Sequence, residues 1–253
     1  MQRQVFLQSL IQWGWIYAIS RLGWSAESQK SKTVNAWWQG HQALATALRQ
    51  AETDPMMWQD AVQTLCQDID LAELLRLLDF EHLYAQQQLP KQGSKIFRVQ
   101  TEAFGAQTVR LAPKIFANAK GTAVVPHVHN QMVSAHLILA GRFHVRTFDR
   151  QFSEETHGHV LLKPHMDRIL GPGDVSTMSD DRHNGHWLVA QSERAFTLDI
   201  ALTELPFSKP YANPGNAYSM IFVDPTGPLS AQGWIEAPIL DYEIAMARFG
   251  GSQ

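Results

Sequence analysis

The sequence contains a single cysteine, Cys66, among its 253 residues. One cysteine excludes an internal disulfide and any zinc site built from cysteine pairs. The chain also lacks a basic excess, because its formal net charge is −3 at pH 7, so nucleic acid is not an expected partner. Hydrophobic residues make up 45% of the chain, which is ample for a core, and there is no internal repeat or low-complexity segment.

No apolar run has the length and purity of a transmembrane helix. Residues 1–26 come nearest, with Arg3 ahead of a mostly apolar run and small residues at its end, a pattern that fits an export signal. The helical spacing of their apolar residues equally fits an amphipathic first helix or anchor. The first interpretation predicts a periplasmic or exported protein and the second a cytoplasmic one. Membrane contact is expected only through this segment.

Residues 27–95 have helical periodicity. Aromatic and aliphatic residues between positions 37 and 48 recur at steps of three and four, as on one face of a helix. Asp54 followed by Pro55 is typical of a helix start. Because six tryptophans precede residue 60, we expect them to pack these helices together.

Beyond the segment LPKQGSK the pattern changes to short runs rich in Val, Ile, Phe and Leu, punctuated by Gly, Pro, Asn and Asp. Many short strands without intervening helices predict a mainly β fold, a sandwich or barrel, over residues 96–205. Residues 206–253 are expected to form a C-terminal extension that packs on the barrel. The last part of this extension returns to a helical pattern.

Nine of the eleven histidines lie between residues 127 and 186. His127 and His129 form a His-x-His pair, and on a strand such a pair faces one side, so both imidazoles can bind one metal ion. Neutral imidazoles suit Zn, Cu, Fe or Ni. A third ligand must come from a distant strand. His186, which begins an apolar run, is preferred over His183, which lies in a polar loop and is expected to be solvated.

Residues 121–141 read Gly, five residues, His-x-His, four residues, Ser134, six residues, Gly. This spacing resembles the first motif of the cupin superfamily, except that Ser134 stands where that motif has a glutamate. A Gly-Asp turn at 173–174 followed by His186 resembles the second motif, with a slightly longer loop. The resemblance covers roughly residues 96–205. It implies a double-stranded β-helix barrel with one divalent metal ion in its mouth.

Because it lacks the glutamate, the motif resembles the three-histidine iron sites of cysteine dioxygenase and its relatives. Three neutral ligands leave a divalent metal with its full charge, which favours a small anionic organic substrate. The resemblance therefore implies a mononuclear non-heme iron oxidoreductase of the dioxygenase type, with Fe(II) favoured over Zn, Ni, Mn or Cu. Two alternatives stay open: a non-oxidative zinc or nickel cupin enzyme, and a non-catalytic binding module whose metal site is closed by a fourth protein ligand.

His136 lies two residues beyond Ser134 on the same strand face. Three roles are open to it: a metal ligand, a residue behind the ligands that relays a proton, or a core histidine held by structural hydrogen bonds. For Arg110 and Lys114, on the strands before the motif, a place on a solvated strand face is preferred, and the alternative is an anchor for a substrate carboxylate.

The remaining histidines are expected in surface or packing positions. They are His41, His82, His144, His157, His159 and His165. The last three lie in a polar, turn-rich stretch, where their crowding allows a second metal. The run SDD at 179–181 is expected to be a surface loop. The expected partner is a small-molecule substrate, and the sequence is compatible with a homodimer.

Overall fold

The computed structural model describes residues 33–251 except 87, 103, 152–157 and 206–219. The chain divides into a unit Met1–Lys30 and a unit Ser31–Gln253. The first unit lies outside the described residues, and with it the predicted export signal or anchor over residues 1–26. Among the described residues, no helix is both long and apolar enough to cross a membrane.

Helices form the first part of the described chain, as predicted. They are α2 (Val34–Arg49), α3 (Pro55–Gln67), α4 (Leu71–Leu77) and α5 (Phe80–Gln86). The Asp54 side chain caps α3 by accepting a hydrogen bond from the N–H of Met57 at 2.8 Å, and Pro55 occupies the first turn, where no N–H is needed. Three of the six tryptophans lie in this region, and each is at most 1% exposed: Trp37, Trp38 and Trp58.

The strands form two antiparallel sheets. The first has the order β1-β2-β9-β4-β7, and its strands are β1 (Lys95–Arg98), β2 (Lys114–Ala119), β9 (Arg194–Leu202), β4 (Val133–Ala140) and β7 (Val175–Met178). The second closes on itself in the order β10-β11-β6-β5-β8-β3, and its strands are β10 (Met220–Val223), β11 (Ile235–Leu240), β6 (His159–Leu170), β5 (Phe143–Arg150), β8 (Gly185–Ala190) and β3 (Ala123–His129). Helix α6 (Tyr242–Phe249) follows the last strand.

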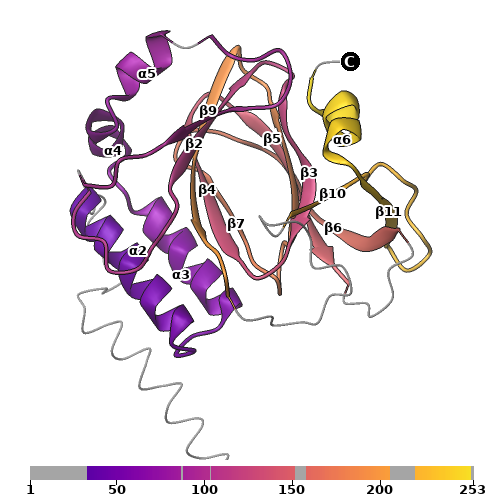
Figure 1. Cartoon of the computed structure of the whole chain (residues 1–253), viewed down its shortest axis with the longest axis horizontal. Helices are drawn as coiled ribbons and strands as arrows, with labels where there is room; N and C mark the ends of the chain where they lie inside the picture. Colours follow the sequence, from indigo (N-terminus) through magenta and orange to yellow (C-terminus); the bar gives the residue numbers. More distant parts are fainter. Residues whose placement is uncertain (1–32, 87, 103, 152–157, 206–219, 252–253) are drawn as a thin grey trace, which may run out of the picture. The chain divides into compact units, whose positions relative to one another are not determined.

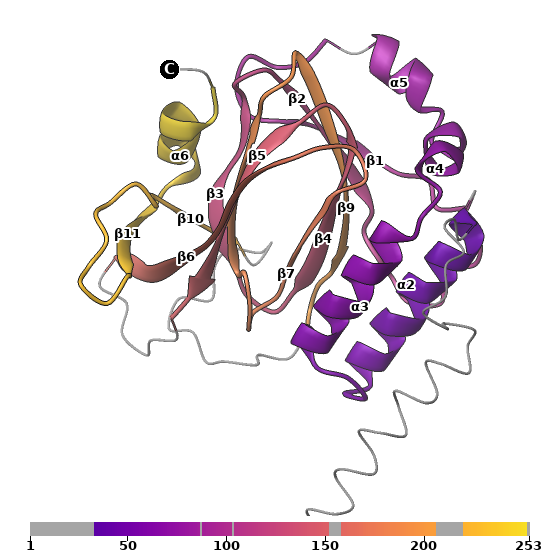
Figure 2. The same ribbon diagram turned by 180° about the vertical axis from the view of Figure 1, so that it is seen from behind.

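Between β2 and β9 the chain passes repeatedly from one sheet to the other. Strands β2, β4, β7 and β9 belong to the first sheet, and β3, β5, β6 and β8 belong to the second. Figures 1 and 2 show the two sheets facing each other, so the chain winds around a common interior as a double-stranded β-helix. This arrangement confirms the predicted mainly β, cupin-type barrel preceded by a helical region.

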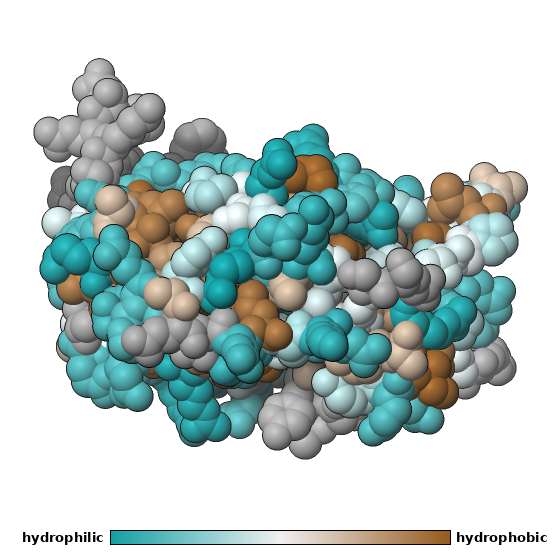
Figure 3. Space-filling model, turned by 90° about the horizontal axis from the view of Figure 1, so that it is seen from above, coloured by the Kyte–Doolittle hydropathy of each residue, from teal (hydrophilic) through white to brown (hydrophobic). Residues whose placement is uncertain are grey.

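Helices flank the two sheets separately. Helix α3 packs against β4 and β7 of the first sheet, whereas α6 packs against β3 and β10 of the second (Figure 1). Phe104 packs edge-on against Trp37 and Trp38, which ties the helical region to the segment that leads into the barrel. The face of the molecule drawn in Figure 3 is largely hydrophilic and carries separate small hydrophobic patches.

The interior between the sheets has an apolar part and a polar part. The apolar part consists of Ile138, Phe143, Val145, Leu188, Ala190 and Ala195. Alternate residues of a strand share a face, so the face of β4 that carries Ile138 also carries His136, and the face of β8 that carries Leu188 also carries His186. The aliphatic core therefore ends where the histidines begin.

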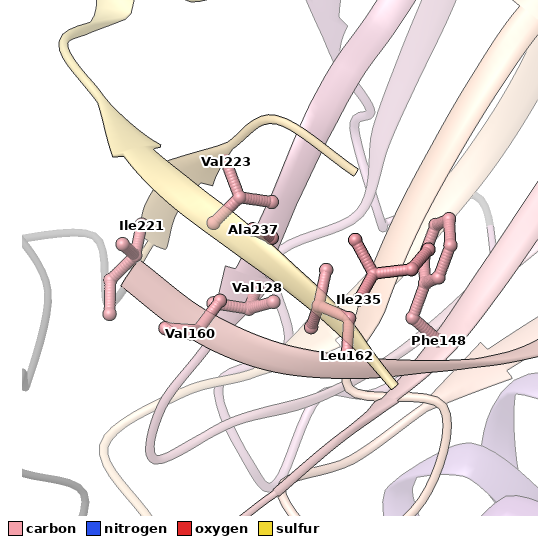
Figure 4. Close-up of a cluster of buried hydrophobic side chains, with 8 residues drawn as sticks. All are labelled: Val128, Phe148, Val160, Leu162, Ile221, Val223, Ile235 and Ala237. Atoms are coloured by element: carbon pink, nitrogen blue, oxygen red, sulfur yellow. The ribbon is translucent and has the colours of Figure 1, made fainter. Parts of the chain in front are cut away.

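The C-terminal extension differs from the expectation for residues 206–253. It does not only pack on the barrel, because β10 pairs with β3 and β11 pairs with β6 to close the second sheet. Eight side chains fill the space that these strands enclose (Figure 4): Val128, Phe148, Val160, Leu162, Ile221, Val223, Ile235 and Ala237. Strands of 4 and 6 residues have too little local pattern to be recognised, since their partners lie far away in the sequence.

The polar stretch around residues 157–165 also differs from its expected turn-rich conformation. His159 to Leu170 form the 12-residue strand β6. Its register against β5 shifts between Thr147 and Phe148, which leaves His165 as the extra residue of a bulge beside Pro164. A bulge accommodates a proline within a strand, because the ladder of hydrogen bonds is interrupted there and proline has no N–H to donate. His157 lies outside the described residues.

Buried His41 makes the stability of the helical region depend on pH. Its ring lies edge-on to Trp37, with centroids 4.6 Å apart, and burial lowers its pKa to about 3. A histidine with a lowered pKa stays neutral in the folded chain, while the unfolded chain takes up the proton below about pH 6.5. Stability is therefore lost as the pH falls through that range.

We expect His41 alone to reduce the free energy of unfolding by about 2 kcal/mol between pH 7 and pH 5. Urea denaturation of His41→Gln at both pH values should show a correspondingly smaller pH dependence than the wild type. His82→Gln is the matched control, because His82 is exposed on α5. Equal pH dependence in the wild type and His41→Gln would contradict the prediction.

Candidate metal centre

Three buried histidines converge inside the barrel. His127 and His129 come from β3 and His186 from β8, and each offers one nitrogen so that the three nitrogens lie within 4.8 Å of one another. The ring centroids are 4.5 Å apart for the two β3 histidines, and His186 lies 4.3 Å and 5.1 Å from them. Within the described part of the chain, no other group of three His, Cys, Asp or Glu side chains converges in this way.

Strand pairing explains this convergence. His127 lies directly opposite His186 in the β3–β8 ladder, and directly opposed residues share a face of the sheet. The register shifts between Val124 and His127, a stretch that includes Pro126, so the ladder resumes at the first histidine. His129, two residues further along, faces the same side.

The ring nitrogens that these imidazoles leave available fit a metal ion. Nδ1 of His127 lies 2.7 Å from the carbonyl oxygen of Val125, which can only accept, so this nitrogen donates and Nε2 is left for a ligand. Both ring nitrogens of His129 and Nε2 of His186 are buried without a hydrogen-bond partner among the described residues. Burying unpaired polar atoms costs free energy, and a bound cation would offset this cost.

The electrostatics also favour metal binding. Burial lowers the pKa of His127 to about 4, with a further decrease from His136 and an opposing effect of the Val125 carbonyl. Burial, followed by the neighbouring histidines, lowers the pKa of His129 and of His186 well below the usual value. All three side chains are therefore neutral at pH 7, which is the form that binds Zn, Cu, Fe or Ni.

Ser134 supplies no carboxylate to this site. It is 1% exposed on β4, and its hydroxyl has no hydrogen-bond partner in the part of the chain that the structure describes. His136, on the same face of β4, is not part of the three-histidine group. Its ring centroid lies 4.8 Å from that of His186, so His136 stands beside the group.

A row of ionisable residues crosses the first sheet next to the histidines. Asp199 on β9 lies opposite His136 on one side and opposite Lys114 on the other. The distance from His136 Nε2 to Asp199 Oδ1 is 3.8 Å. Burial raises the pKa of Asp199, while His136 and Lys114 act in the opposite direction. Lys114 thus has a carboxylate neighbour within the protein, whereas Arg110 is exposed and lies before the strand.

The other described histidines are not part of the three-histidine group. His183 contacts His165, with tilted rings whose centroids are 3.9 Å apart. His144 pairs with Asp167, and His159 pairs with Glu236. The described residues hold no three-histidine group at the predicted second metal position.

The run SDD at 179–181 is not the predicted surface loop. Ser179 is fully buried and Asp180 is 5% exposed. The Asp180 carboxylate accepts a hydrogen bond from the N–H of Gln131 at 2.7 Å, and burial raises its pKa to about 6. Polar residues are buried here because the neighbouring backbone and helix α3 supply partners for them.

Two polar residues of the site had not been selected from the sequence. Asp199 is the single acidic residue of β9, where most residues are apolar, and a carboxylate in such a run indicates a buried charge that needs a partner. Thr147 on β5 lies opposite His186, and its buried hydroxyl has no hydrogen-bond partner within the described chain. Its pattern in the sequence is that of any strand threonine, so only the cross-strand register reveals it.

The fold and the histidine cluster together define a cupin-type barrel with a candidate metal centre. No protein-family model matches the sequence, and neither does any curated protein. Among solved structures, a cupin superfamily protein from Desulfitobacterium hafniense DCB-2 is 21% identical, with 47% of this chain and 84% of that chain covered and a TM-score of 0.32.

Two further solved structures have comparable scores. KdgF from Halomonas sp. is 20% identical, with 47% of this chain and 86% of that chain covered and a TM-score of 0.33. A recombinant oxalate oxidase in complex with glycolate is 15% identical, with 53% of this chain and 56% of that chain covered and a TM-score of 0.34. At this level of similarity, the chemistry of the site must follow from its own residues.

Proposed function

We propose that this protein is a mononuclear metal-dependent oxidoreductase of the dioxygenase type, which uses Fe(II) and acts on a small anionic organic substrate. The observation that carries the proposal is the set of three buried, neutral histidines without a carboxylate ligand. His127, His129 and His186 would hold the ion. When bound, it would supply a Lewis acid and a one-electron redox centre.

The charge of the site selects the substrate. Neutral ligands would leave the two positive charges of the metal uncompensated in buried surroundings, where an unpaired charge is costly. A substrate that coordinates through a thiolate, enolate or carboxylate oxygen would offset them. A glutamate at position 134 would provide the compensating negative charge from the protein. Because Ser134 stands there instead, that role is left to the substrate.

In this proposal, His136 would hold a proton next to bound substrate. Its ring lies beside His186, and both of its nitrogens are buried with no hydrogen-bond partner among the residues that the structure describes. The Asp199 carboxylate, 3.8 Å from Nε2, would orient the ring. This role differs from that of a fourth metal ligand, which would close the site.

Replacement of His136 separates these two roles. We expect His136→Gln to keep the metal content of the wild type and to lower kcat/KM about 10²–10⁴-fold, the usual contribution of a positioned proton donor or acceptor. Metal analysis and steady-state kinetics of the same preparation measure both quantities. Loss of the metal together with activity would instead assign His136 to the ligand set.

Metal analysis of protein purified without chelator or nickel affinity resin tests the proposed function itself. We expect near-stoichiometric iron, and oxygen consumption when small thiols or enolisable carboxylic acids are added. The zinc-reconstituted protein is the control and should consume no oxygen. Native zinc or nickel without oxygen uptake would favour a non-oxidative enzyme, and a metal with no open coordination position would favour a binding module.

A further inference from the structure

His129 lies just beyond the end of its neighbouring strand. Strand β8 begins at Gly185, and its pairing with β3 ends with Gly185 opposite Val128. The side chain of Asn184 takes over at this point. Its Oδ1 accepts a hydrogen bond from the N–H of His129 at 3.2 Å, and its Nδ2 donates to the carbonyl oxygen of His129 at 2.9 Å.

A carboxamide can replace a main-chain partner because it has the same donor and acceptor as a peptide group. Asn184 therefore continues the ladder by one residue with its side chain. It is 1% exposed, so water does not compete freely for these hydrogen bonds. On the other edge of β3, Met220 of β10 lies opposite His129. Both main-chain polar groups of His129 bond to Asn184, so this side chain supplies its ladder hydrogen bonds.

Asn184 is in turn held by Ser179. Nδ2 of Asn184 also donates to the carbonyl oxygen of Ser179 at 3.2 Å. The Ser179 hydroxyl accepts hydrogen bonds from the N–H groups of Asp181 and Arg182, both at 3.1 Å, which closes the loop tightly around it. These contacts explain why a polar loop is buried beside the histidines.

Helix α3 completes the connection. The Ser179 hydroxyl donates to Oε1 of Gln59 at 2.7 Å, and Nε2 of Gln59 donates to the carbonyl oxygen of Arg182 at 3.3 Å. Gln59 and Ser179 are both fully buried. The Arg182 side chain also binds the helix, through Asp60 and the carbonyl oxygen of Met56. Loop 179–184 is therefore fixed to α3 by several side chains.

We propose that Gln59, Ser179 and Asn184 are positioning residues for the metal centre. Through these three side chains, helix α3 would fix the position of the backbone of the ligand His129. The inference rests on the proposed metal site and assigns a role to the helical region. The helix restrains the end of β3, where the barrel alone provides no main-chain partner from β8. Residues that orient metal ligands typically contribute 10–100-fold to metal affinity.

Cobalt(II) binding to the metal-free full-length protein tests the proposal. Its d–d absorption bands report ligand geometry, and its titration gives the affinity. We expect Asn184→Ala to bind Co²⁺ about 10–100-fold more weakly, with shifted bands, and Gln59→Ala to change both in the same direction by less. Gln63→Ala, an exposed glutamine one turn further along the same helix, should behave as the wild type.

Backbone amide exchange of His129 in the metal-free protein gives an independent measurement. It should accelerate in Asn184→Ala and in Gln59→Ala, but not in Gln63→Ala. The inference would be overturned if Gln59→Ala left the Co²⁺ affinity, the absorption bands and the His129 exchange rate unchanged, even if that variant is less stable. Gln59→Ala alone also tests the inference if Asn184→Ala does not fold. A wild-type protein that does not bind Co²⁺ would instead overturn the proposed metal site.

Discussion

His129→Ala is expected to abolish stoichiometric metal binding and to leave the fold intact. Removal of one of three ligands should weaken the affinity by more than the roughly 10–100-fold loss that is typical when only a supporting residue is changed. The fold should survive, because neither ring nitrogen of His129 makes a hydrogen bond to any described residue that its removal would break. We expect a loss of about 1–2 kcal/mol in the free energy of unfolding, as for many buried substitutions.

Metal analysis by mass spectrometry and calorimetric titration with Zn²⁺ measure the first effect, and urea denaturation measures the second. His165→Ala is the matched control, because His165 is exposed on β6 and outside the three-histidine group. It should retain full metal content. Full occupancy in His129→Ala would remove this residue from the ligand set, and metal-bound but unfolded protein would give it a structural role.

Gly141→Ala is expected to be strongly destabilising. Gly141 joins β4 of the first sheet to β5 of the second, and its φ of +70° is a conformation that L-residues avoid. An added Cβ would lie 2.3 Å from the carbonyl oxygen of Arg194 and 2.9 Å from Cα of Ala195. Both contacts are with the backbone of β9, so no side chain can rotate away. We expect a loss of about 3–5 kcal/mol.

Gly173→Ala separates the two causes of this loss. Gly173 has a φ of +89°, yet nothing lies within 4 Å of its added Cβ. Only the conformational strain then applies, and we expect a loss of about 1–2 kcal/mol. Urea denaturation of both variants measures the difference. Similar losses in the two variants would show that the close approach to β9 is relieved by a backbone shift.

Local sequence determined the elements whose causes are local. The aspartate-proline start of α3 follows from capping chemistry within four residues, and the strand-rich middle of the chain follows from its short apolar runs. The positive φ of Gly141 is a local turn requirement that glycine meets without strain, whereas the close approach of β9 that excludes a Cβ there is a tertiary contact. The spacing of His127 and His129 places both on one strand face whatever the partner strand is.

Tertiary structure alone decided the features that depend on pairing between distant strands. The sequence preferred His186 to His183 as the third member of the cluster, but the contact itself follows from the register that places His186 opposite His127. Strands β10 and β11 exist because β3 and β6 offer open edges to segments too short to form by themselves.

The same reason applies to the polar residues around the histidines. Asp199 meets His136, and Asn184 meets His129, only after β9 and β8 have taken their places in the two sheets. The sequence by itself therefore determined which side chains can share a face and where the chain must turn. The tertiary structure decided which faces meet, because cross-strand register depends on contacts that no local spacing encodes.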